Sequence, residues 1–89
     1  IDSNNLLYYR AQYYLGHLYY TKANYHLAQL AFNSSMIDPE LSSPSKWYLG
    51  LTLLQIGKTK EAKEIISSIS QSKNDEFSMR AYEILQKLK

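Results

Sequence analysis

Apolar residues recur at three- and four-residue steps along most of the chain, a spacing that places side chains on one face of an α-helix. In the first such stretch the stripe consists of Leu7, Ala11, Leu15, Leu18 and Tyr19. Glycine, proline and polar clusters divide the pattern into five segments. The helices are predicted near residues 4–21, 25–37, 44–56, 59–71 and 75–88, and no strand is expected.

Proline, glycine and serine predict several of the helix ends. Asp38 stands before Pro39, where the backbone is pushed out of the helical conformation, so the second helix should end there with Asp38 solvated in a loop. Ser43 is the predicted N-cap of the third helix. Gly57 is predicted to end that helix by adopting the left-handed conformation.

A longer period overlies the helical one. Leu15-Gly16 recurs as Leu49-Gly50, at an offset of 34 residues. At the same offset, Tyr14 returns as Tyr48, Tyr19 as Leu53, Ala28 as Ala62 and Phe32 as Ile66. Glycine inside a helix costs about 1 kcal/mol relative to alanine, so close helix packing must offset that cost. We therefore predict that Ala28 and Ala62 lie opposite the two glycines.

A 34-residue period that carries L-G-x2-Y and then A-x3-F resembles the tetratricopeptide repeat. The resemblance implies an all-α, right-handed superhelical stack of antiparallel helix pairs. It implies one domain over residues 1–89, with repeat one at about 6–39, repeat two at about 41–72 and a capping helix at about 75–88. Ala23 departs from the pattern, because it stands where the second repeat has Gly57. The turn at Ala23 should therefore be strained or differently shaped.

Repeats of this family bind peptides or partner helices, so the resemblance implies a protein–protein interaction scaffold. The first helix of each pair lines the concave groove in that family. By helical phase, the predicted groove residues are Arg10, Tyr13, His17, Tyr20, Thr21, Trp47, Leu51, Leu54 and Gln55. Family members that hold a terminal carboxylate use several Lys, Arg and Asn side chains, whereas this set offers only Arg10. An aromatic, apolar contact with a protein or peptide is expected instead.

The distribution of tyrosine supports a second interpretation. The chain has nine tyrosines, and seven lie between Tyr8 and Tyr25. Aromatic residues at helical spacing are also typical of packing inside a core or between copies of a chain. The alternative function is therefore a structural self-assembly or homo-oligomerisation module that packs through the helix from Leu6 to Tyr20.

Composition argues against several other classes. A net charge of +2 with dispersed basic residues disfavours nucleic acid, which is bound through clustered Lys and Arg. The chain has no cysteine, and His17 and His26 have no third ligand at a fixed spacing, so no metal or cofactor is expected. No catalytic motif indicates an enzyme. No apolar run approaches the roughly twenty residues of a membrane span.

The second half of the chain bears on location. From Trp47 to Leu88 its general pattern is similar to repeats of bacterial cell-envelope proteins, including lipoproteins of outer-membrane assembly. The resemblance favours a location in the cell envelope, either periplasmic or membrane-anchored, over a cytoplasmic one.

Overall fold

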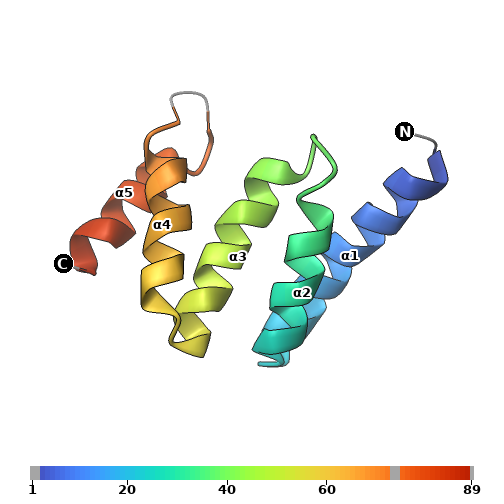
Figure 1. The fold of residues 1–89 in the computed structure, drawn as a ribbon, viewed down its shortest axis with the longest axis horizontal. Coiled ribbons are helices and arrows are strands. Elements are labelled where there is room, and N and C mark those ends of the chain that lie inside the picture. The colour runs from blue at the N-terminus through green and yellow to red at the C-terminus, as the bar shows by residue number, and fades with distance from the viewer. Residues whose placement is uncertain (1–2, 73–74, 89) are drawn as a thin grey trace.

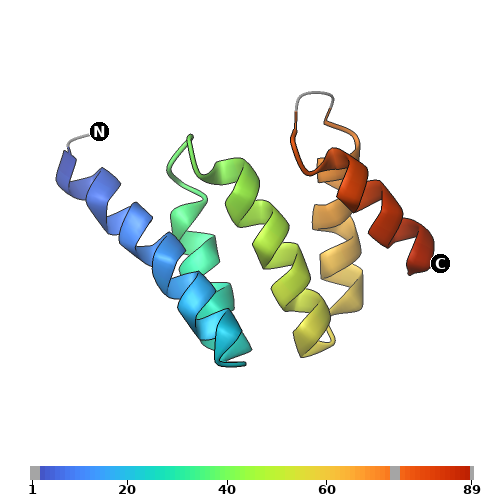
Figure 2. The ribbon, with the colours of Figure 1, turned by 180° about the vertical axis from the view of Figure 1, so that it is seen from behind.

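The computed structural model describes residues 3–72 and 75–88. Within these ranges the chain forms five helices and no strand: α1 Ser3–Thr21, α2 Tyr25–Ser35, α3 Ser42–Ile56, α4 Thr59–Ser70 and α5 Ser78–Lys87. Each helix packs on the next one in the chain. Figures 1 and 2 show the helices in a row of alternating direction, with α1 at one end and α5 at the other. The predicted all-α class is confirmed, and the helices form consecutive pairs.

The row is thin, which limits how much of each helix is covered. Its principal extents are 42 × 30 × 17 Å. The buried core runs along the row through α2, α3, α4 and the start of α5. Its members are Ala28, Phe32, Trp47, Leu49, Leu53, Ala62, Ile66, Ile69, Phe77 and Ala81. Over residues 6–21 of α1, for which burial is described, Gly16 alone is buried, so this part of the first helix is covered on fewer sides than α3.

The two helical glycines allow the helices of each pair to approach closely, as predicted, but their neighbours differ from the prediction. A Cβ on Gly16 would lie 2.6 Å from Cε1 of Phe32, and one on Gly50 would lie 2.8 Å from Cγ1 of Ile66. The residues opposite the glycines are therefore the large Phe32 and Ile66. The prediction that Ala28 and Ala62 lie there is wrong. The glycines make room for a bulky side chain rather than for a small one.

The turns inside the two pairs have the same shape. Ala23 has a φ of 63° and Gly57 a φ of 94°, both in the left-handed region. In the first turn the N–H of Asn24 donates to the carbonyl of Tyr19 at 2.8 Å, and the bond at the same offset in the second turn measures 2.9 Å. The predicted strain at Ala23 is thus confirmed. A left-handed conformation costs a residue with a Cβ roughly 1–2 kcal/mol, so the packing of the first pair must outweigh that cost.

Helix ends depart from the prediction where loop side chains form other contacts. Ser43 lies inside α3, and its hydroxyl donates to Oδ2 of Asp75 at 2.7 Å instead of capping the helix. The other oxygen of Asp75 accepts the N–H of Phe77 at 2.8 Å. Residues 75–77 consequently form a turn that delays the start of α5. The helix α2 also ends earlier than predicted, at Ser35.

Replacing each glycine by alanine should show that the two packing contacts differ in how well they tolerate an added methyl group. Gly16→Ala meets three atoms of the rigid Phe32 ring within 2.8 Å, whereas Gly50→Ala meets only one Ile66 atom that closely. Overpacking typically costs 1–3 kcal/mol, so we expect Gly16→Ala to lower the free energy of unfolding by about that amount. Gly50→Ala should cost less, because its methyl group meets one close atom rather than three. The gain in helix propensity, about 1 kcal/mol at either glycine, then offsets more of the clash.

Urea denaturation of the two variants measures this difference. Phe32→Leu placed on the Gly16→Ala background is the control, since it removes the ring that the new methyl group meets. The double variant should lose less stability than the two single changes added together. A Gly16→Ala protein as stable as the parent would contradict the close contact.

Candidate protein-interaction surfaces

The structure places the predicted groove residues in three environments. Arg10, Thr21 and Gln55 are exposed. Tyr13, His17, Tyr20, Leu51 and Leu54 are partly buried, and the apolar members of this group pack against the core. Trp47 is buried. The nine residues thus do not form one uniformly open surface.

Trp47 belongs to the core. Only 4% of it is exposed, and its ring stacks on Phe77 with centroids 5.5 Å apart and an interplanar angle of 12°. Phe77 immediately precedes α5, so the return of the chain toward α3 covers the indole. The prediction that Trp47 contacts a partner in the groove is therefore wrong.

Aromatic side chains join α1, α2 and α3. The ring of His17 lies 4.3 Å from Tyr48 and 4.6 Å from Tyr13, between centroids, in edge-on arrangements. Phe32 stacks on Tyr48 at 5.8 Å. Burial lowers the pKa of His17, and burial together with nearby Tyr48 raises the pKa of Tyr13. Edge-to-face and offset pairs stabilise such clusters, so Tyr13 and His17 hold helices together besides lining the predicted groove.

Arg10 is held by two carboxylates. Its Nε lies 3.5 Å from Oδ2 of Asp38, and its Nη2 lies 3.2 Å from Oε2 of Glu40. Asp38 is 1% exposed, and its Oδ1 accepts the N–H of Glu40 at 3.0 Å. The prediction of a solvated Asp38 is wrong, because the carboxylate is enclosed where the loop after α2 meets α1. Arg10 compensates that buried charge and is therefore already paired within the chain.

Three of the large exposed apolar side chains of α1 lie along one line, and the exposed Tyr8 lies beside that line. Leu7 is 63% exposed, Tyr14 72% and Leu18 49%. With the exposed Ala11 they form a run at steps of four, three and four residues, a spacing that keeps side chains on one helical face. We call these four residues the outer stripe. Sequence spacing places Leu7, Ala11 and Leu18 on one helical face, and the structure leaves these three side chains exposed.

The second repeat shows how such a face packs when it has a neighbour. At the 34-residue offset, the counterparts of Ala11, Tyr14 and Leu18 are Ser45, Tyr48 and Thr52. Ser45 and Thr52 are fully buried, and the hydroxyl oxygens of Ser45 and Ser35 lie 2.6 Å apart across the contact of α3 with α2. The stripe on α3 is thus an internal packing face, whereas the matching face of α1 has no such neighbour among the residues that the structure describes.

The outer side of α2 is also more apolar than its counterpart. Leu27 and Leu30 are exposed, whereas the residues 34 positions later are the exposed Glu61 and Glu64. The first helix pair therefore displays apolar side chains at positions where the second pair displays charges. The first pair therefore differs from the second in having an apolar rather than a charged outer surface.

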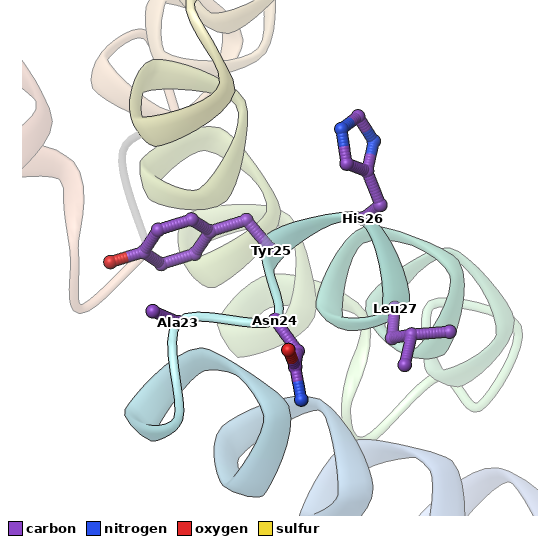
Figure 3. A pocket seen from close by; sticks show the side chains of 5 residues that line it. All are labelled: Ala23, Asn24, Tyr25, His26 and Leu27. Atoms are coloured by element: carbon purple, nitrogen blue, oxygen red, sulfur yellow. The ribbon is translucent and has the colours of Figure 1, made fainter.

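A shallow depression of about 200 Å³ lies at the turn between α1 and α2. Its lining residues are the consecutive Ala23, Asn24, Tyr25, His26 and Leu27. Figure 3 shows that their side chains diverge, with the His26 ring directed away from the Asn24 amide. Groups that do not converge cannot hold a small ligand in one orientation, and the depression does not coincide with the predicted groove.

The part of the chain that the structure describes shows neither a metal-binding cluster nor a membrane-spanning helix. Over residues 3–72 and 75–88, no three His, Asp or Glu side chains are grouped so that they could hold a metal ion. No helix in the same ranges combines the length and apolarity required to cross a membrane. No protein-family model matches the chain, and no curated protein or solved structure is significantly similar to it.

The partly buried His17 should make the free energy of unfolding depend on pH. Because its folded pKa lies below the ordinary value of 6.5, the unfolded chain takes up a proton as the pH falls through about 6.5, while the folded chain still resists protonation. The stability present above that pH is therefore lost progressively toward the lowered folded pKa. His17→Phe keeps an aromatic ring in the cluster and should reduce this pH dependence.

Urea midpoints measured across that pH range would test the assignment. His26→Gln is the control, because His26 is exposed and outside the aromatic cluster. The parent and His26→Gln proteins should lose stability in parallel as the pH falls, and His17→Phe should lose less. Parallel curves for all three proteins would show that His17 is not the responsible group.

Proposed function

We propose that the chain is a protein–protein interaction scaffold whose docking surface is the outer stripe of α1. The observation that supports this proposal is the exposure of Leu7, Tyr14 and Leu18 on one helical face. Exposed apolar side chains gathered in one place mark interaction sites more often than scattered ones do. The partner is a helix of another polypeptide with an apolar, uncharged face.

The composition of the outer stripe fits a helical partner. Its steps of four, three and four residues match the narrow seam that two helices share when their side chains interdigitate. Tyr14, the most exposed large side chain of the stripe, offers an aromatic body with a polar tip, a combination enriched at interaction sites. Ala11 leaves space beside it into which a partner side chain can pack.

The predicted groove is a second candidate docking surface. Tyr13, Tyr20, Leu51 and Leu54 pack on the core and still keep part of their surface open. Side chains fixed in this way lose little conformational freedom when a peptide binds. With His17, Thr21 and Gln55 they could bind an extended or helical peptide through apolar contact, without a contribution from Trp47.

Membership of the tetratricopeptide repeat family is part of the same proposal. Its support is the 34-residue offset, which recurs in the glycine contacts and in the hydrogen bonds of both turns. The right-handed superhelical twist follows from that resemblance. A location in the bacterial cell envelope is proposed from the pattern of residues 47–88 alone. No reaction or cofactor is assigned to the chain.

Partner capture by the tagged chain tests which surface carries binding. Tyr14→Glu places a charge in the outer stripe and should abolish capture of specific partners identified by mass spectrometry. Tyr82→Glu is the matched control, since Tyr82 is 57% exposed on α5 at the other end of the row. Both variants should keep the helicity of the parent, because neither side chain is buried.

Variants of the groove distinguish the second candidate. Thr21→Arg and Gln55→Arg alter exposed predicted groove residues and should leave capture unchanged if the outer stripe binds. Capture lost with these two changes and retained with Tyr14→Glu would instead assign binding to the groove. Capture that none of the variants alters would contradict both assignments.

A further inference from the structure

We infer that the outer stripe of α1 pairs with the same stripe of a second copy of this chain, with the two α1 helices antiparallel. The inference rests on the proposed function, because it names the partner of that docking surface. It starts from the contrast between the repeats: the face that α3 buries against its neighbour is the face that α1 leaves exposed.

The outer stripe is its own complement when its direction is reversed. Its members stand at positions 7, 11, 14 and 18, which are symmetric about a point between residues 12 and 13. In an antiparallel pair Leu7 meets Leu18 of the second copy, and Ala11 meets Tyr14. Apolar residues thus face apolar ones, and the large ring faces the smallest side chain. This alternation of large and small groups is what close helix packing requires.

The other helical faces of a second copy are less suitable partners. The face of α2 that receives α3 is buried, and so is the face of α4 that receives α5. On α5 the exposed Met79 and Tyr82 alternate with the charged Arg80 and Glu83. An apolar stripe set against that face would desolvate unpaired charges, which is unfavourable. The outer side of α2 exposes Leu27 and Leu30, two apolar residues against the four of the outer stripe. The uncharged stripe of α1 therefore remains the best match for itself.

Charge does not oppose the antiparallel pair. The four stripe residues carry no charge, and Arg10 borders them on α1. Two copies would bring their Arg10 side chains to the same edge of the interface, where like charges would repel each other. Each Arg10 is compensated within its own chain by Asp38 and Glu40, at 3.5 Å and 3.2 Å. The pairing therefore requires no new partner for a charged group.

The antiparallel geometry makes a specific prediction about distances between copies. Leu7 should lie beside Leu18 of the second copy, whereas two Leu7 residues should be about 16 Å apart along the helix axes, from eleven residues at 1.5 Å each. A disulfide requires Cα atoms within about 7 Å of each other. Because the chain has no cysteine, single cysteine variants report these distances without interference.

The experiment mixes Leu7→Cys and Leu18→Cys proteins under mild oxidation and identifies the cross-linked peptides by mass spectrometry. We expect the 7–18 cross-link to form faster in the mixture than the 7–7 or 18–18 cross-link forms in either protein alone. Met79→Cys is the control, because it lies on α5 and is 71% exposed. It should cross-link slowly with both. Adding Tyr14→Glu to each protein should suppress the 7–18 product.

Three results would overturn the inference. Dominant 7–7 and 18–18 products would indicate a parallel pair, and rapid cross-linking to Met79→Cys would indicate a head-to-tail arrangement. A parent chain that sediments as a monomer at every concentration and gives no cross-link would exclude self-association. The last result leaves the proposed function intact if Tyr14→Glu still abolishes capture of a different protein, so the two failures are distinguishable.

Discussion

The packing of Phe32 and Ile66 against bare backbone at Gly16 and Gly50 is the contact on which both helix pairs depend. A Cβ at either glycine would lie within 2.8 Å of the opposing side chain, so the separation of the two helices is set by the absence of that atom. That separation also constrains the conformation of the short connection between the two helices. This explains why the first pair keeps the left-handed turn even though alanine, rather than glycine, stands at position 23.

The arrangement of the helices in one row determines which surfaces remain free. Each helix packs mainly on its neighbours in sequence, so the two ends of the row have one neighbour where α3 has two. On α5 the exposed Met79 and Tyr82 stand among the exposed Arg80, Glu83 and Lys87, so this face is partly charged. The outer stripe of α1 has no charged member, and this difference between the two helices is the basis for its proposed role.

Much of the fold could be predicted because it follows from local sequence. The three- and four-residue spacing of apolar residues located the five helices, and the conformational freedom of Gly57 located a helix end. The equivalence of Ala23 with Gly57 predicts the strained turn. These features depend on a few neighbouring residues, so they can be predicted from the local sequence. The residues facing the glycines depend on the crossing of two helices and were assigned one turn away from their actual position.

The candidate site was harder to predict because it depends on which surfaces are covered. Spacing alone places Leu7 and Leu18 on a helical face, but it does not say whether another helix lies against that face. For the same reason the burial of Trp47 was not predicted, because the side chain is covered where the chain returns at Phe77. The burial of Asp38 was not predicted either, because it depends on the position of Arg10 beside it. Tyr14 had a visible signal in its equivalence with Tyr48, a residue that packs between repeats.

Amide hydrogen exchange of α1 relative to α3 tests the central claim most directly, because the two helices are matched position by position at the 34-residue offset. An uncovered α1 should exchange faster than α3 in dilute solution, where few copies are paired. As the protein concentration rises, the protection of amides around Ala11 and Tyr14 should increase, while that of amides around Ser45 and Tyr48 stays constant. Equal protection of the two helices at low concentration, or protection of α1 that is independent of concentration, would contradict the account.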